Sequence, residues 1–505
     1  MRMVSLKLTI PLIPIMQQDE NVIMEENKKK AAEFLRNGID PYGHRFAKTA
    51  NAAEILEGNK KLKNGSRVNK NLLIAGRIKS IRRHGNLIFA HIEDFSGRIQ
   101  VVVEKKSVGK KNFDIFNHLN IGDFVGVSGS PAKTIRGEVS VWAKTAEILS
   151  KAIRPLPTEW FGLKDSEIRY RQRYTDMAVN AQVRDIFVER SGILKAMREY
   201  LDKNGFIEVN TPVLQPIYGG AFAEPFVTYH NILKRKMYLM ISPELYLKRA
   251  VVGGFERVYE ICRNFRNEGI DTKHNPEFTM MELYWAYADY TDNMKLTEEM
   301  IAFIAKKVLG ATKINYQGKT IELKPPYKRI TMFDSIKKQL GIDVEKLSLD
   351  QLKAEAKKHN IGIPEYMDKG MVITELFDAV EKKIIQPTFI TDFPVEVSPL
   401  AKAKKDNPKL TERFELIING QEYANAYTEE NNPMEQRKKF ERQMELRKAD
   451  DKEAMPIDED FITALEYGLP PTSGLGIGVD RLVMLLTNQP SIRDVIMFPI
   501  LKGKE

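Results

Sequence analysis

The segment from Phe255 to Tyr290 constrains the fold of this chain more than any other, because side-chain character alternates along two consecutive runs. The alternation predicts an antiparallel hairpin, with an extended arm over 258–268, a polar loop over 269–275 and a return strand from Phe278. One face of the predicted hairpin is apolar and can pack on a core. It carries Tyr259, Ile261, Phe265, Met281, Leu283 and Trp285.

The opposite face of the predicted hairpin mixes charged, aromatic and apolar side chains. It carries Glu260, Asn264, Arg266, Glu268, Phe278, Met280, Glu282 and Tyr284. A solvated surface is the ordinary explanation for charges on a strand. Here rings and apolar groups stand among the charges, and a second carboxylate-rich strand follows far downstream, at 413–420. We therefore interpret this face as a ligand-binding surface.

Two motifs within the hairpin carry a family resemblance. Phe265-Arg266-Asn267-Glu268, followed by His274-Asn275-Pro276-Glu277-Phe278, resembles motif 2 of the class II aminoacyl-tRNA synthetases. The match is close to the lysyl-tRNA synthetases of class IIb and extends from about residue 66 to the C-terminus. The resemblance implies an α+β protein, in which an N-terminal OB-fold β-barrel precedes a catalytic domain built on an antiparallel β-sheet flanked by helices.

Composition sets the broad class of the protein. The chain has 505 residues, of which 43% are hydrophobic and 29% charged, and this predicts two or three soluble globular domains. No apolar run approaches the roughly 18 residues of a membrane helix, so we expect no membrane partner. Cys262 is the only cysteine, which excludes an intrachain disulfide and agrees with a cytoplasmic location. The opening segment, 1–16, is interrupted by Pro11 and Pro14, and we expect no secretory signal there.

The order of predicted elements divides the chain into four parts. Polar helices fill an N-terminal extension, 1–65, and five short strands with a helix between the third and fourth fill 66–152, which is OB-fold order. A proline-containing linker over 153–182 leads to a catalytic domain over 183–505. The catalytic domain contains a helical, charge-rich insertion at about 330–383, in which we find no chemical signature.

The predicted OB-fold segment is basic. Residues 66–152 contain 15 Lys+Arg against 7 Asp+Glu, whereas the whole chain has a net charge of +10. A local basic excess favours a polyanionic partner, and cations among rings suit a single-stranded nucleic acid. The resemblance implies anticodon contacts by Arg82, Phe89, Gln100 and Glu138, with the Phe89 ring stacking on a base. An amide and a carboxylate suit the reading of base edges.

A helical period over 183–201 is followed by a strand-like run over 206–214 that contains Pro212. Periodicity alone predicts only a helix and an edge strand. The pair resembles motif 1, which forms the dimer interface of class II synthetases, so the resemblance implies a homodimer.

The resemblance also implies an amino-acid pocket for L-lysine. Its members would be Gly220, Glu244, Arg266, Glu282, Tyr284, Asn425, Tyr427 and Glu429. Glu429 and Tyr284 would hold the ε-ammonium group, and Glu244 would bind the α-amino group. An ordinary carboxylate in the first turn of a helix is the alternative for Glu244. The following run, Glu430-Asn431-Asn432-Pro433, departs from the Leu-Asn-Asp of the family.

Nucleotide binding has to use a route other than a P-loop, because no such motif is present. Glycines at alternate positions, 474, 476 and 478, leave one strand face bare, and Arg481 follows in the first turn of a helix. The helix dipole disfavours a cation there, so we expect an anionic ligand; a strand that uses its glycines only for packing is the alternative. The resemblance, here to motif 3, implies ATP binding by Arg266, Glu268, His274, Asn275, Phe278, Glu415 and Arg481, with Arg266 and Arg481 catalytic.

A metal site is expected beside the nucleotide. Glu415 and Glu422 match the metal-binding pair of the family, and hard carboxylate oxygens suit Mg²⁺. The resemblance implies up to three Mg²⁺ ions per subunit, with ATP as a substrate.

These features together predict a lysine–tRNA ligase, which forms lysyl-adenylate and pyrophosphate and then transfers lysine to the 3′ end of its tRNA. An aspartyl or asparaginyl enzyme is the nearest alternative, although it would need a basic or amide partner where this chain has carboxylates. A tRNA-binding paralogue without catalysis is a second alternative, against which the complete set of arginines and carboxylates speaks. A protein-modifying lysine ligase is a third, and its relatives lack the anticodon domain.

Overall fold

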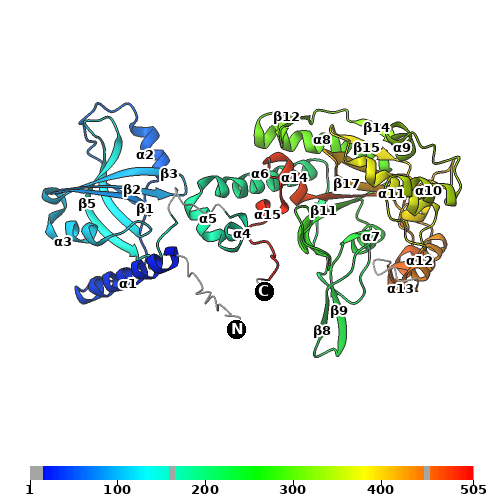
Figure 1. Cartoon of the computed structure of the whole chain (residues 1–505), viewed down its shortest axis with the longest axis horizontal. Coiled ribbons are helices and arrows are strands. Elements are labelled where there is room, and N and C mark those ends of the chain that lie inside the picture. The colour runs from blue at the N-terminus through cyan, green and yellow to red at the C-terminus, as the bar shows by residue number, and fades with distance from the viewer. Residues whose placement is uncertain (1–14, 158–164, 449–454, 504–505) are drawn as a thin grey trace, which may run out of the picture. The chain divides into compact units, whose positions relative to one another are not determined.

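The computed structural model describes residues 15–157, 165–448 and 455–503 (Figure 1). Parts of the predicted N-terminal extension and linker, 1–14 and 158–164, lie outside these ranges. The chain forms two compact units, and the division falls between residues 164 and 165. We describe each unit by itself.

Two helices, α1 (Ile15–Arg36) and α2 (Ala52–Asn59), precede the barrel of the first unit and pack on it. Phe34 of α1 and Ile55 of α2 belong to the barrel core. Polar contacts add to this packing: Asn27 Nδ2 donates to the carbonyl of Ile153 at 2.9 Å, and Lys30 Nζ donates to Asn120 Oδ1 at 2.8 Å. The two helices are therefore part of the first unit.

The first unit is a closed five-stranded barrel, with neighbours in the order β1-β2-β3-β5-β4. Its elements are β1 (Leu72–His84), β2 (Leu87–Asp94), β3 (Gly97–Glu104), α3 (Lys105–His118), β4 (Phe124–Lys133) and β5 (Val139–Ser150). The side chains of β1 alternate, so that Leu72, Ile74 and Ile78 are buried inside. The helix lies between the third and fourth strands, and the predicted OB-fold is confirmed.

The second unit is built on an eight-stranded sheet in the order β14-β15-β16-β17-β18-β11-β10-β6. The strands are β6 (Ile207–Glu208), β10 (Arg257–Phe265), β11 (Glu277–Ala286), β14 (Lys328–Thr331), β15 (Thr388–Thr391), β16 (Arg413–Ile418), β17 (Gln421–Thr428) and β18 (Thr472–Gly478). Only the two edge pairs, β14 with β15 and β6 with β10, are parallel. The predicted antiparallel catalytic sheet is therefore confirmed.

The predicted hairpin forms β10 and β11, which lie between β18 and the edge strand β6 in this sheet. Tyr259 stands opposite Leu283 in the ladder, and both side chains are 0% exposed in the main core, as the alternation predicts. The first arm ends earlier than expected, at Phe265 instead of at residue 268. The amide of Arg266 still donates to the carbonyl of Pro276 at 2.9 Å, but Pro276 has no N–H to return the bond, so the ladder stops there.

Helices cover both faces of the large sheet (Figure 1). The main core packs one face against α6 (Ala181–Lys203), α8 (Tyr290–Leu309) and α14 (Val479–Leu486). A second core packs the other face, through Val258 and Tyr284, against α7 (Glu244–Val252), α12 (Pro433–Lys448) and α13 (Glu459–Glu466). The polar side of the hairpin therefore faces α7.

The predicted strand over 206–214 is not a single strand. Residues 207–208 form β6 of the large sheet, whereas β7 (Leu214–Gln215) joins β8 (Val227–His230) and β9 (Arg235–Leu239) in a separate sheet. Pro212, which cannot donate a ladder hydrogen bond, lies in the break between the two.

The smaller elements complete the second unit. They are α4 (Ser166–Arg171), α5 (Arg173–Val179), β12 (Lys313–Tyr316), β13 (Lys319–Glu322), the 3₁₀ helix η1 (Val395–Val397) and α15 (Ile492–Val495). The segment 330–383 holds α9 (Met332–Leu340), α10 (Leu349–Lys358) and α11 (Lys369–Glu381), which share a core around Leu352 and Phe377. No helix in the described ranges combines the length and apolarity needed to cross a membrane.

Candidate active site

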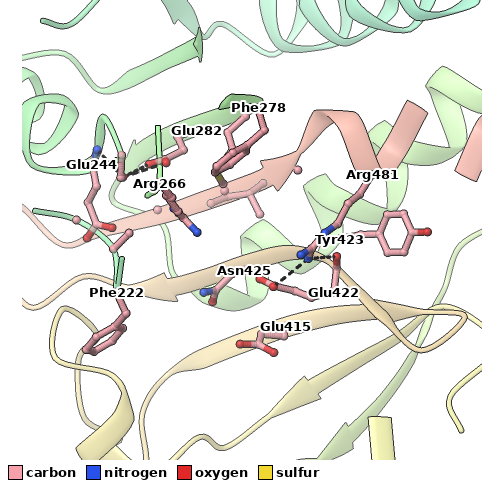
Figure 2. A pocket seen from close by; sticks show the side chains of 18 of the residues that line it. Phe222, Glu244, Arg266, Phe278, Glu282, Glu415, Glu422, Tyr423, Asn425 and Arg481 are labelled. Carbon is pink, nitrogen blue, oxygen red and sulfur yellow. Dashed lines mark hydrogen bonds and ion pairs between the residues drawn. The ribbon is translucent and has the colours of Figure 1, made fainter. Parts of the chain in front are cut away.

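A cavity of about 340 Å³ opens on the α7 side of the large sheet (Figure 2). This volume is typical of small-molecule sites. Nearly all residues predicted for lysine, ATP and metal line it: Gly220, Glu244, Arg266, Glu268, His274, Asn275, Phe278, Glu282, Tyr284, Glu415, Glu422, Asn425, Tyr427 and Arg481. Glu429 is the exception among them, because it is 1% exposed and lies behind the wall.

The glycine-rich strand β18 forms the floor of the cavity between β11 and β17. Gly474 pairs with Tyr284 on one side and with Tyr427 on the other. A Cβ atom at Gly474 would lie 2.2 Å from Glu429 Oε1 and 2.6 Å from a ring carbon of Tyr284. Any side chain there would displace the groups of the pocket, so the bare strand face predicted from sequence is a steric requirement.

Three carboxylates and two tyrosines form what we call the acidic end of the cavity: Glu244, Glu282, Glu429, Tyr284 and Tyr427. The hydroxyl of Tyr427 donates to both oxygens of Glu244, at 2.8 and 2.7 Å. Ser242 Oγ donates to Glu282 at 3.0 Å, and the hydroxyl of Tyr284 donates to the same carboxylate at 3.4 Å. Glu429 Oε1 is buried and accepts no hydrogen bond from any described residue.

Burial controls protonation at the acidic end. Burial, reinforced by the nearby Glu244, raises the pKa of Glu282 to about 8. Burial likewise raises the pKa of Glu429 well above its ordinary value, although Lys248 opposes this effect. The same causes raise the pKa values of Tyr284 and Tyr427. A cationic ligand would relieve the repulsion among these groups.

The acidic end contains a cation of its own that the sequence analysis missed. Lys248 lies four residues after Glu244 on α7, is fully buried, and forms ion pairs with Glu244 and Glu429. Glutamate and lysine four residues apart on a helix lie side by side, so this spacing predicts their contact from sequence. That the pair is buried, and that Glu429 joins it, depends on the tertiary fold.

Arg266 and Arg481 form the arginine end of the same cavity (Figure 2). The Arg266 guanidinium carbon lies 5.1 Å from the centre of the Phe278 ring, and its Nε atom is buried without a hydrogen-bond partner among the described residues. Burial lowers the pKa of Arg266, while Glu268 and Glu282 oppose the shift. A buried guanidinium with unmet donors is suited to an anionic ligand.

Arg481 extends from the first turn of α14 into the cavity, as predicted. Its Nη1 donates to the carbonyl of Glu422 at 2.8 Å and lies 3.3 Å from the Glu422 carboxylate. The preceding residue, Asp480, anchors the start of the helix by accepting a hydrogen bond from the Thr279 amide at 2.7 Å and pairing with Arg190 of α6. The helix start is thus tied to the hairpin strand β11.

The loop between β10 and β11 borders the arginine end. His274 is exposed, and its Nδ1 lies 2.8 Å from Asp271 Oδ2. Asn275 is buried and donates to the carbonyl of Glu277 at 2.5 Å. Glu268 is exposed at the cavity rim. These side chains line the cavity together with Phe278.

The predicted metal pair, Glu415 and Glu422, comes from the hairpin of β16 and β17. The turn at Asn419-Gly420 has positive φ at both residues, 48° and 68°, which is the two-residue hairpin turn that this dipeptide favours. A bulge shifts the register between Leu416 and Ile417. Both carboxylates reach the cavity.

The neighbours of Glu415 include residues of the insertion, where the sequence offered no signature. Burial raises the pKa of Glu415 to about 8; Arg413, at 2.6 Å, opposes this, while Glu422, Asp378 and Glu381 add to it. Asp378 and Glu381 lie on α11, three residues apart, so they share a helix face. Within the described ranges no three carboxylate, imidazole or thiol groups are arranged to hold a metal ion.

The predicted anticodon residues lie together on the barrel of the first unit. Arg82 of β1 stands opposite the half-buried Phe89 of β2. Gln100 of β3 donates to Glu138 at 2.7 Å, and His91 Nε2 lies 2.8 Å from the other oxygen of Glu138. A strip of one ring and several polar groups thus crosses the strands.

Glu430, where the family pattern has leucine, is buried but fully accommodated. One oxygen pairs with Lys439 of α12 at 2.7 Å, and the other accepts the amide of Asn432 at 3.1 Å. Glutamate in place of leucine at position 430 is therefore accommodated by an ion pair, and Glu429 stays behind the pocket wall.

Comparison with known proteins gives two family matches. Residues 165–502 match the family described as tRNA synthetases class II (D, K and N). Residues 72–149 match the family described as OB-fold nucleic acid binding domain.

Full-length relatives agree with these matches. A protein of Carboxydothermus hydrogenoformans is 52% identical over 491 residues, covering 97% of this chain and 99% of the relative. One of Pelotomaculum thermopropionicum is 52% identical, covering 97% and 96%. One of Bacillus subtilis is 50% identical, covering 96% and 98%. All three are named lysine–tRNA ligase.

Proposed function

We propose, from the premise that this chain belongs to the class II tRNA synthetases for aspartate, lysine and asparagine, that it is a lysine–tRNA ligase. It activates lysine with ATP and transfers the lysyl group to tRNA. The observation that carries the choice of lysine is the acidic end, where three carboxylates stand at one end of a cavity whose other end holds two arginines. An aspartate side chain would meet like charge there.

Each end of the cavity has its own task in this proposal. Glu244 receives the α-ammonium group of lysine, and Glu429 with Tyr284 receives the ε-ammonium group. The free Oε1 atom of Glu429 and the bare backbone of Gly474 support this, because an ammonium group needs an acceptor and room to approach it. Glu282 and Asn425 complete the wall.

Adenylate formation is then a matter of position and charge. The planar guanidinium of Arg266 bridges the lysine carboxylate and the α-phosphate of ATP, which a fork of donors does better than a point charge. Phe278 stacks on adenine, Glu268, His274 and Asn275 surround the nucleotide, and Arg481 holds the terminal phosphate. The carboxylate attacks in line and pyrophosphate leaves, so no covalent enzyme intermediate is needed.

Mg²⁺ fits the carboxylates beside the nucleotide. Glu415 and Glu422 are the residues that would hold it. Burial, and after it repulsion from Glu422, raises the pKa of Glu415, and a bound cation would oppose both effects. Mg²⁺ is commonly held by one or two carboxylates together with nucleotide phosphates, which the pair Glu415 and Glu422 would allow. When bound, the ion neutralises charge on the departing pyrophosphate.

The first unit binds the anticodon in this proposal. Phe89 stacks on a base and Arg82 neutralises phosphate, while Gln100 and Glu138 supply the directional donors and acceptors. Their mutual hydrogen bond at 2.7 Å supports the assignment, because it fixes the orientation of the Gln100 amide. The site of action would be the cytoplasm, where tRNA is charged.

A homodimer is the proposed assembly. The motif 1 region exposes apolar side chains that a second subunit would cover, with Ile207 54%, Val213 43% and Leu214 50% exposed. Size measurement by light scattering tests this point.

The central experiment is amino-acid-dependent pyrophosphate exchange over the twenty amino acids, followed by charging of tRNA. We expect exchange with lysine far above all others, and lysyl-tRNA as the product. Exchange with aspartate or asparagine would favour the alternative synthetases. Absence of exchange in a protein that still binds tRNA would favour a paralogue without catalysis.

A further inference from the structure

Lys248 is a buried cation behind the acidic end, with no role in the proposed reaction so far. Its side chain is 0% exposed, and its Nζ atom lies 2.6 Å from Glu244 Oε1. The same ammonium group forms a second ion pair with Glu429 Oε2. The rings of Tyr427 and Phe461 each lie 5.7 Å from it. One ammonium group therefore bridges the two carboxylates that are proposed to receive the substrate.

The groups around this bridge come from four elements. Glu244 shares α7 with Lys248; Tyr427 comes from β17 and Glu429 directly follows that strand; Phe461 comes from α13. From β11, Glu282 and Tyr284 add a carboxyl group and a phenol next to Glu244 and Glu429. Among the described residues, Lys248 is the cation that forms ion pairs with Glu244 and Glu429. Arg249 lies 5.7 Å from the Phe461 ring, and Arg266 opposes the rise in the pKa of Glu282 that burial causes.

Without this bridge the two carboxylates would not both stay ionised. Buried carboxylates that face each other without a cation repel and take up protons. The bridge uses one oxygen of Glu429 and leaves Oε1 without a hydrogen-bond partner among the described residues, beside Gly474. Glu244 meanwhile reaches the cavity, where Tyr427 also contacts it. Each carboxylate thus keeps one oxygen that the bridge does not use.

We propose that Lys248 is a positioning residue that makes the site selective for an amino acid with two ammonium groups, because it holds Glu244 and Glu429 as two separate anionic acceptors. This inference rests on the proposed lysine function. It adds which residue makes the site select lysine over neutral amino acids. A pocket without the bridge would still have the shape of the lysine chain. It would lose the charge that distinguishes lysine from a neutral analogue of the same length.

The test compares Lys248→Met, which keeps the side-chain length and removes the charge, with the wild-type chain. Binding of lysine and of 2-aminohexanoate, which lacks the ε-ammonium group, is measured by calorimetry on the full chain. Breaking one side of a buried pair should weaken lysine binding by about 100-fold or more. The analogue should lose much less, so the selectivity ratio falls. The lysine loss should also shrink as the pH rises, because the unpaired carboxylates then ionise.

A matched control is Lys438→Met, which removes an exposed lysine from a lysine–glutamate pair on α12. It should leave both affinities and ATP binding unchanged. Lys248→Arg keeps the positive charge and should retain most of the selectivity ratio. If Lys248→Met weakens lysine and 2-aminohexanoate equally, at every pH, Lys248 only supports α7 and the inference is overturned.

A double variant keeps the test decisive if Lys248→Met alone does not fold. Lys248→Met combined with Glu429→Gln leaves a neutral pair and is compared with Glu429→Gln. We expect little further loss of selectivity, because the two residues act as a unit. A further loss of about 100-fold or more in lysine binding, which is the loss expected for the lysine change alone, would overturn the inference. A wild-type chain that binds aspartate or asparagine instead of lysine would overturn the proposed function and the inference together, whereas a lysine-specific chain whose selectivity is unchanged in Lys248→Met would overturn the inference alone.

Discussion

The two ends of the cavity differ in charge, and they differ as much in how their charges are paired. At the acidic end Lys248, Ser242 and Tyr427 already bind the carboxylates, and Glu429 is 1% exposed. At the arginine end the Nε atom of Arg266 has no described partner, and the Arg481 side chain is 24% exposed. A closed, internally compensated site suits discrimination between similar side chains. A partly open one, in which Arg266 keeps a donor without a described partner and Arg481 forms its ion pair with Glu422, suits capture of a highly charged ligand.

This comparison has an energetic consequence. Removal of one charge from a closed pair leaves its partner desolvated and unpaired, which is costly. Removal of an exposed charge lets water replace it. We therefore expect the loss of activity on mutation to decrease from the acidic end towards the partly exposed Arg481.

Glu429→Gln should have the largest effect. Glutamine keeps the shape and one acceptor, but the ammonium group of lysine then meets a neutral partner. Loss of one side of a buried charge pair costs on the order of 2–5 kcal/mol, or roughly 30-fold to several thousand-fold in kcat/KM for lysine. ATP binding should stay near normal. Pyrophosphate exchange with lysine, and titration with ATP, measure the two effects.

The control for this change is Glu435→Gln, at an exposed pair on α12, which should have no effect. The neutral analogue 2-aminohexanoate never uses the charge, so its binding should barely change. Equal losses for lysine and the analogue would make Glu429 a structural residue.

Arg266→Lys should have the second-largest effect. Lysine keeps the positive charge but replaces the planar fork with a single point of donation. Loss of one preorganised donor slows a reaction by about 10²–10³-fold in kcat, with smaller changes in substrate affinity. Single-turnover adenylate formation measures this effect. Arg263→Lys, three residues earlier on β10 and with a side chain 51% exposed, is the matched control and should be near wild type.

A third prediction concerns the pH dependence of stability. Burial raises the pKa of Glu282 from 4.5 to about 8, so this carboxyl is protonated in the folded chain where the unfolded chain would ionise it. Its contribution to stability is complete below pH 4.5 and is lost as the pH rises towards 8. Glu282→Gln should remove this loss, which amounts to at most a few kcal/mol in the free energy of unfolding. Chemical denaturation at pH 5 and pH 8 should show the variant gaining relative to wild type, and parallel curves would contradict the assignment.

Sequence reasoning was most successful where the pattern is local. The alternation of the hairpin, the alternate glycines of β18 and the order of strands and helix along the first unit are all visible in runs of neighbouring residues, and the structure contains them. The sequence predicted that this strand ends three residues later than it does. The proline that stops the ladder, Pro276, lies just before the opposite strand and gives no signal in the residues of β10.

The rest of the site depends on contacts between distant segments. Lys248 could be paired with Glu244 from helical spacing, but its contact with Glu429 joins residues 181 positions apart, which no local pattern shows. Asp378 and Glu381 gave no signal because charged residues on an insertion helix are usually solvated. Their proximity to Glu415 follows from the packing of α11.

The smallest effect is expected for Arg481→Ala, at the open end. Arg481 faces only the nucleotide in the proposed site, so lysine binding should be unchanged. Its side chain is 24% exposed, and water can therefore take over part of its role. A hydrogen bond to a charged group is worth about 1.5 kcal/mol at the lower end, which predicts an increase of about 10-fold in KM for ATP. Because salt screens exposed charges, the difference from wild type should narrow as the ionic strength rises. Direct titration with ATP and with lysine separates the ends of the cavity: equal weakening of both ligands would mean that Arg481 holds α14 in place, and the contrast between a closed and an open end would no longer explain the ranking.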